Sequence, residues 1–76
     1  MKLHELQKGE KAVVKGLPSD QILRERLHSF GIFKESHLEV KEVSLVKATL
    51  VVALNQSLMI LRSSEAESIE VEKLVS

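Results

Sequence analysis

The 76-residue chain has no cysteine, no tryptophan and no tyrosine, and its aromatic side chains are two phenylalanines. Without cysteine, disulfide bonds, thiolate zinc sites and iron–sulfur clusters are excluded. With so few aromatic rings, the chain cannot line a groove for proline-rich peptides or stack a series of nucleic-acid bases.

The chain also has no excess of either charge, because 11 Lys and Arg balance 11 Asp and Glu. This balance argues against a nucleic-acid partner, since such binding depends on counterion release from a basic surface. No run approaches the ~18 consecutive apolar residues that span a bilayer, and residues 1–11 contain no apolar signal-peptide core. We therefore expect a cytoplasmic protein with no direct membrane insertion.

The common motifs of catalysis and cofactor binding are missing as well. There is no P-loop, G-x-S-x-G or dinucleotide-binding pattern. His4, His28 and His37 do not have the spacing of helical metal ligands. A chain of this size also has little room for an apolar catalytic pocket. We therefore expect no catalytic residue, no metal site, no cofactor and no enzymatic activity.

The sequence does contain the pattern of one small folded domain over residues 1–76. Its hydrophobic fraction of 43% is ordinary for a globular chain and argues against disorder. A helix is predicted over about residues 20–30, because Leu23, Leu27 and Phe30 recur at helical spacing after Ser19-Asp20, and either Ser19 or Asp20 can cap its free N–H groups. Gly31 follows where a left-handed residue ends a helix, so we expect a positive φ there.

Alternating or β-branched apolar residues predict strands at 12–17, 38–41, 45–54, 58–62 and 69–71. A short turn containing Leu3 and Leu6 precedes them, and a helical turn is expected at 64–67. This order favours a mainly β fold, a small SH3-like barrel of about five strands with one α-helix in the first long connection. Closure of such a barrel removes exposed strand edges. An open α+β sheet with the helix on one face is the alternative.

The hairpin expected around Asn55-Gln56 is apolar on both of its faces. One face suits the barrel core and consists of Leu50, Val52, Leu54, Met59 and Leu61. The other face should meet water, yet it consists of Val51, Ala53, Leu58 and Ile60. Either the helix covers this second face, or the face is exposed and marks a surface for a partner or for self-association. Phe33, in the loop after the helix, is a further candidate for an exposed apolar contact.

Several segments, in their order and spacing, resemble the family of ferrous iron transport protein A (FeoA). Leu3-x-x-Leu6-x-x-Gly9-Glu10 is similar to the opening of that family, and Arg26-Leu27 followed by Gly31-Ile32 is similar to its helix end. Leu61-Arg62 with Ala66, Ile69 and Val71 resembles its closing segments. The chain departs from the family at Lys34-Glu35, where Pro-Gly is usual, and at Lys47-Ala48-Thr49, where Gly-Asp-Pro is usual.

The resemblance implies an SH3-like fold and a role beside ferrous iron transport protein B, a membrane permease with a cytoplasmic G-domain. It implies a cytoplasmic accessory or regulatory protein that docks on this permease or on its G-domain. The alternative is a small transition-metal-binding or metal-sensing domain, since a related barrel ends the diphtheria-toxin-repressor-like metalloregulators. For partner binding or a homo-oligomer we select Phe33 and the second hairpin face, and for structural roles Gly31, Leu27 and Leu61.

Overall fold

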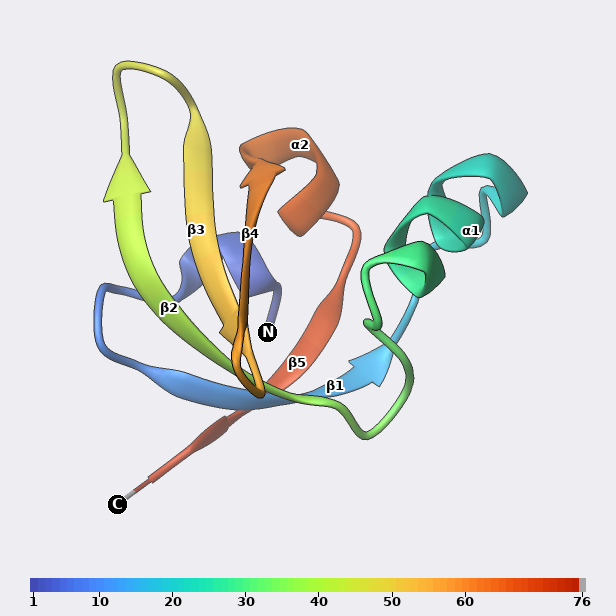
Figure 1. Ribbon diagram of the computed structural model, residues 1–76, viewed down its shortest axis with the longest axis horizontal. Helices are drawn as coiled ribbons and strands as arrows, with labels where there is room; N and C mark the ends of the chain where they lie inside the picture. Colours follow the sequence, from blue (N-terminus) through green and yellow to red (C-terminus); the bar gives the residue numbers. More distant parts are fainter. Residues whose placement is uncertain (76) are drawn as a thin grey trace.

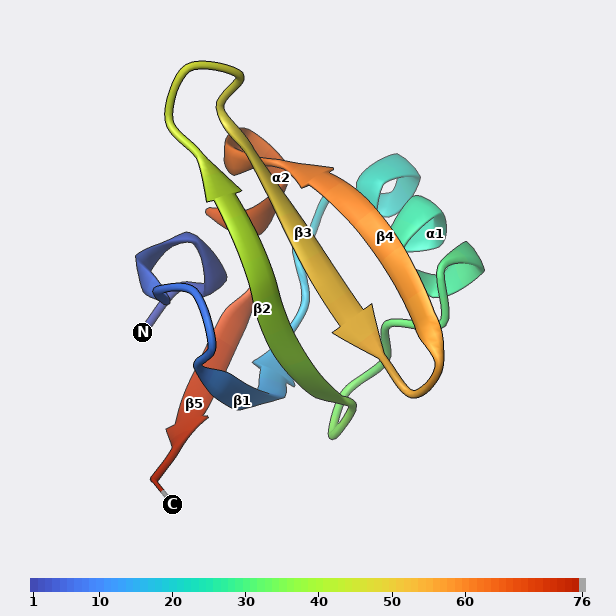
Figure 2. The ribbon, with the colours of Figure 1, turned by 60° about the vertical axis from the view of Figure 1, so that its left-hand side comes forward.

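A computed structural model describes residues 1–75 and shows one antiparallel sheet of five strands in the order β4-β3-β2-β1-β5 (Figures 1 and 2). The strands are β1 (Lys11–Gly16), β2 (His37–Ser44), β3 (Thr49–Leu54), β4 (Ser57–Arg62) and β5 (Glu70–Leu74). The 3-10 helix η1 (Leu3–Glu5) precedes β1, α1 (Gln21–Ser29) joins β1 to β2, and α2 (Ser63–Ala66) joins β4 to β5. The predicted mainly β fold, with its helix in the first long connection, is confirmed.

The start of α1 is fixed by Asp20. Its Oδ1 accepts hydrogen bonds from the backbone N–H groups of Ile22 and Leu23, at 2.9 and 3.1 Å. These bonds satisfy donors that have no partner inside the helix. The sequence had left Ser19 and Asp20 as alternative caps, and the structure selects Asp20.

The end of α1 is fixed by Gly31, whose φ of +89° is the predicted left-handed conformation. The N–H of Gly31 donates to the carbonyl of His28, and the N–H of Ile32 donates to that of Leu27, both at 2.9 Å. This pair of bonds is a Schellman motif, and it brings the fully buried Leu27 and Ile32 together. The helix end is therefore joined directly to the hydrophobic core.

The β3–β4 hairpin has the predicted register, with Val52 opposite Met59 and Val51 opposite Ile60. Asn55 begins its two-residue turn with a φ of +58°, a conformation that asparagine tolerates. The face assigned to the core is buried, and Leu61 on it is fully buried. The sheet wraps around this core together with η1, α2 and one side of α1.

The strand predicted over 45–54 is wrong in its first part. β2 continues to Ser44, β3 begins only at Thr49, and residues 45–48 form the turn between them. The Ser44 Oγ accepts a hydrogen bond from the N–H of Lys47 at 3.2 Å, and Ala48 has a φ of +51°. The turn was missed because it contains no Gly, Pro or Asn, and three of its four residues are apolar.

The sheet is not closed by hydrogen bonds between β4 and β5 in the described part of the chain, so closure does not remove both edges as expected. The reason is that the N-terminal segment occupies the side of β5 that faces away from β1. Val71 donates to the carbonyl of Met1 at 2.8 Å, and Leu3 donates to that of Ile69 at 2.9 Å. β4 is therefore left as an edge strand.

Candidate partner-binding surface

The outer face of the β3–β4 hairpin carries four apolar side chains, which we call the hairpin patch: Val51, Ala53, Leu58 and Ile60. Leu58 is 67% exposed and Ile60 is 64% exposed, whereas the two β3 residues are half-buried. Figure 2 shows the hairpin from this outer side, with α1 beyond β4. The helix packs Leu23 and Phe30 against the core instead of covering the patch. Of the two predicted arrangements, the exposed face is the one observed.

The patch continues across the sheet as a row of directly opposed residues. Leu58 on β4 faces Ala53 on β3, Ala53 faces Glu39 on β2, Glu39 faces Lys11 on β1, and Lys11 faces Leu74 on β5. Opposite charges thus meet in the middle of the row, and the apolar side chains lie toward its ends. An apolar area beside a charged border is typical of protein–protein contact surfaces.

A shallow cavity of about 180 Å³ lies where this row passes the small side chain of Ala53. Its floor includes Leu38, and His37 and Asn55 supply polar groups on its border. A space of this size accepts one apolar side chain of a partner. The cavity therefore extends the hairpin patch.

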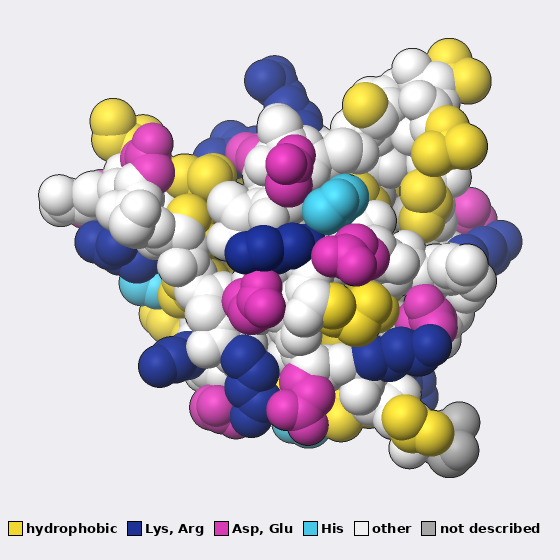
Figure 3. Space-filling view, turned by 180° about the vertical axis from the view of Figure 1, so that it is seen from behind, with side chains coloured by type: hydrophobic (Ala, Val, Ile, Leu, Met, Phe, Trp, Pro, Cys, Tyr) yellow, Lys and Arg dark blue, Asp and Glu magenta, His cyan; other side chains and the backbone are white. Residues whose placement is uncertain are grey.

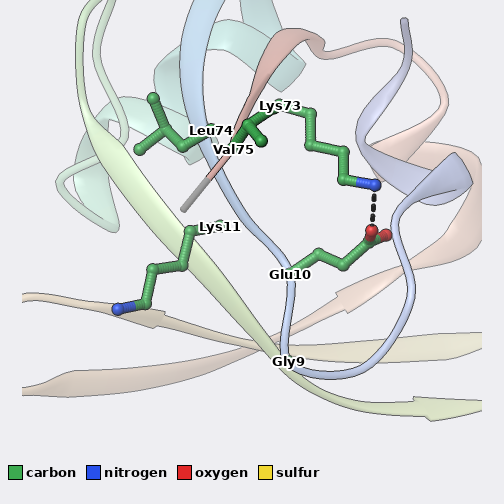
Figure 4. A pocket seen from close by; sticks show the side chains of 6 residues that line it. All are labelled: Gly9, Glu10, Lys11, Lys73, Leu74 and Val75. Carbon is green, nitrogen blue, oxygen red and sulfur yellow. Dashed lines mark ion pairs between the residues drawn. The ribbon is translucent and has the colours of Figure 1, made fainter.

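A larger cavity of about 370 Å³ lies on the other side of Lys11 and Leu74 (Figure 4). Its acidic group, Glu10, is already paired with Lys73, whose ammonium group points at the carboxylate. The hydrogen bond from Lys73 and a second one from the N–H of Gln7 hold the pKa of Glu10 below its ordinary value. A carboxylate held in the charged form is poorly suited to proton transfer near neutral pH.

Phe33 is 51% exposed, as expected for a loop residue, but its ring contacts α1. It stacks on the ring of His28, with ring centroids 4.7 Å apart and ring planes 15° apart. Its N–H donates to the Oγ of Ser36 at 2.9 Å. The structure thus brings four of the five selected residues into one patch and places Phe33 beside α1. Binding of a partner by these residues remains a prediction.

A second exposed apolar feature, at the β2–β3 turn, was not predicted from the sequence. Leu45 is 91% exposed and Val46 is 99% exposed, although both were expected inside a strand. Figure 3 shows hydrophobic side chains gathered over this projecting turn, beside a surface on which basic and acidic side chains alternate. The available signal was the adjacent pair of apolar residues, which breaks the alternation of a half-buried strand.

The three histidines lie on or beside different elements. His4 is in η1, His28 is in α1, and His37 begins β2. Within residues 1–75, no three His, Asp or Glu side chains are arranged to hold a metal ion. None of the described helices is long and apolar enough to span a bilayer.

The family model of the FeoA domain matches residues 1–73. The chain belongs to the FeoA family. It is 45% identical over 71 residues to an Fe(2+) transport protein A from Campylobacter jejuni, a match that covers 93% of this chain and 96% of that protein. The resemblance in the sequence is thereby confirmed.

Solved structures show the same fold for this FeoA-family protein. The solution structure of FeoA from Chlorobium tepidum has a TM-score of 0.90 at 32% identity, covering 99% of this chain and 71% of that one. A manganese-dependent transcriptional repressor has a TM-score of 0.92 at 24% identity, covering 96% of this chain and 40% of that one. The match to the repressor shows only that the two chains share a fold.

Proposed function

We propose that this FeoA-family protein is a non-enzymatic accessory protein of ferrous iron transport that acts on the cytoplasmic side of the membrane. It docks on the membrane permease, ferrous iron transport protein B, or on the G-domain of that permease. The C. jejuni relative supports the role in Fe(2+) transport by its name. That name says nothing of docking on a permease, so the docking step requires a test of its own.

The observation that carries the proposal is the exposed hairpin patch. Leu58 and Ile60 are large apolar side chains on a regular strand, and each is about two-thirds exposed. Burial of each against a partner contributes ~1.5–3 kcal/mol, which is enough to anchor a modest interface. The neighbouring cavity beside Ala53 offers a place for one side chain of the permease.

The test compares two isoleucines that differ in position but not in chemistry. Ile60→Glu places a carboxylate in the hairpin patch, and Ile22→Glu places the same group on α1, where the isoleucine is 81% exposed. Binding to detergent-solubilised permease and to its isolated G-domain is measured by calorimetry. We expect Ile60→Glu to weaken binding at least about tenfold and Ile22→Glu to bind as the parent does.

Thermal unfolding of both variants provides the folding control, because both side chains already face solvent. If both variants fold and Ile60→Glu binds the permease as tightly as the parent, the hairpin patch is not the docking surface. If the parent binds neither the permease nor its G-domain, the docking proposal itself is wrong.

A further inference from the structure

The outer edge of β4 carries backbone groups with no partner. In a hairpin with a two-residue turn, Leu54 and Ser57 form a hydrogen-bonded pair, so Met59 and Leu61 also direct their backbone groups toward β3. Leu58 and Ile60 consequently direct theirs away from β3. No backbone hydrogen bond reaches these two residues from that side anywhere in residues 1–75.

The free part of this edge is short and clearly bounded. At its end, the N–H of Arg62 donates to the Oε1 of Glu65 at 2.9 Å, so that donor is already used. At its beginning lies the turn Asn55-Gln56. Leu58 and Ile60 therefore each have unpaired backbone groups at the edge of the sheet and an exposed apolar side chain on its outer face.

The opposite edge of the sheet is protected in a way that β4 is not. Residues 1–3 cover β5, and Glu70 on that edge pairs with Lys2 at 3.0 Å and with the N-terminal ammonium group at 3.3 Å. β4 has no Lys, Pro or bulge between Ser57 and Leu61, and its register with β3 is uninterrupted. Such features normally block strand addition, so their absence leaves β4 open to it.

We propose that β4 pairs with β4 of a second copy of this chain, antiparallel and about a two-fold axis at Met59. This inference goes beyond the proposed function and does not rest on it. In this register Leu58 pairs with Ile60 of the second copy, and Ile60 pairs with its Leu58. The two pairs use all the free backbone groups of both residues and form four N–H···O=C hydrogen bonds.

Charge and register favour a second copy as the occupant. The only charged side chain of β4 belongs to Arg62, which faces the uncharged Gln56 of the second copy, so no like charges meet. A shift of the axis toward Arg62 would require the donor that Glu65 already holds. A shift toward the turn would place Ile60 against Gln56 instead of against Leu58. The axis at Met59 is therefore the best-matched arrangement.

The size of this contact sets its strength. Two short strands joined over a few residues bury less than the ~1,000 Å² that is usual for a stable interface. We therefore expect a weak dimer that forms only at high protein concentration. In the dimer, Leu58 and Ile60 of both copies lie side by side on the outer face of the joined sheet, so their side chains stay accessible and form one larger apolar patch.

Sedimentation equilibrium of the isolated protein tests the pairing. Between about 10 µM and about 1 mM, we expect the weight-average mass to rise from the monomer value of 8.5 kDa toward twice that value. Ile60→Pro removes an N–H that β3 does not use, so it should keep the fold and abolish the rise in mass. Ile60→Val keeps that N–H and serves as the matched control, for which the rise should remain.

A second measurement locates the axis without any substitution. In a mixture of isotope-labelled and unlabelled parent protein, the two Met59 Hα atoms should show an intermolecular contact at high concentration, because non-hydrogen-bonded antiparallel pairs bring the Cα atoms within about 4.5 Å. A protein that stays monomeric at about 1 mM, or a dimer without this contact, would overturn the proposal. Neither assay contains the permease, so the outcome is independent of the docking test.

Discussion

Gly31 has a conformation and a position that both disfavour a side chain. Its φ is +89°, and a Cβ built there would lie 3.2 Å from the Cδ2 of Leu54. A non-glycine residue held in such a conformation costs ~1–3 kcal/mol. We therefore expect Gly31 to contribute to the stability of the fold.

Replacement of Gly31 by valine should lower the melting temperature by roughly 4–8 °C for each kcal/mol lost. Gly31→Asn should lose less, since asparagine tolerates the left-handed region better than a β-branched residue does. Thermal unfolding followed by circular dichroism measures both variants. Equal melting of Gly31→Val and the parent would show that this conformation is not required.

Glu70 connects the N-terminal segment to β5. The hydrogen bond from Lys2, and next that from the N-terminal ammonium group, hold the pKa of Glu70 below its ordinary value. Since the folded pKa is lower than the unfolded one, this carboxylate stabilises the fold above its unfolded pKa. That contribution is lost as the pH falls through the folded pKa.

We therefore expect the melting temperature to fall between about pH 5 and about pH 3, and Glu70→Gln to reduce that fall. Glu72→Gln, on the same strand, is the control, because Glu72 has no ion pair within residues 1–75. The comparison is made by calorimetry at low salt, where exposed ion pairs are least screened. A steeper fall in Glu70→Gln than in the parent would contradict the assignment.

At the scale of a single element, adjacent residues of β3 lie on opposite faces of the sheet, one in the core and one on the outer surface. Val52 is fully buried, whereas Val51 is half-buried and belongs to the hairpin patch. Val52→Lys should unfold the protein, because it buries a charge with no partner. Val51→Lys should keep the fold and weaken partner binding or self-association. Circular dichroism and amide NMR spectra distinguish the two outcomes, and unfolding by both variants would show that the outer face is interior.

The elements predicted well from the sequence are those fixed by local interactions. Asp20 and Gly31 limit α1 through bonds within a few residues, and Asn55 fixes the hairpin turn and hence its register. The hairpin patch was also visible, because alternation in β3 and β4 places its members on one face. Its exposure was not decided by the sequence, since that depends on where α1 docks.

The features that the sequence did not predict depend on contacts between distant residues or on atypical local chemistry. The covering of β5 by residues 1–3 joins the two ends of the chain, and no local pattern encodes that contact. The turn at Leu45 and Val46 has the composition of a strand, so its one local signal is the broken alternation at this apolar pair, and its hydrogen bonds establish it. The contact of Phe33 with His28 likewise became visible only in the structure.

At the scale of the whole molecule, the three histidines do not share an element of the fold. They belong to three elements, and His28 is stacked on Phe33. We expect calorimetric titration with zinc or ferrous ions to show at most weak binding. A micromolar or tighter site that requires two of His4, His28 and His37 would contradict this and would favour a metal-sensing domain.

The two edges of the sheet are unequal, because residues 1–3 are hydrogen-bonded to β5, whereas no backbone group within residues 1–75 pairs with the outer edge of β4. A second copy that pairs at β4 contributes its own β5 as the new outer edge of the joined sheet, and residues 1–3 of that copy already cover this strand. Growth of the sheet therefore terminates after one addition, whereas a sheet with two open edges could polymerise into a fibre. The first three residues thus block further strand addition at β5, in addition to their contribution to the stability of the fold.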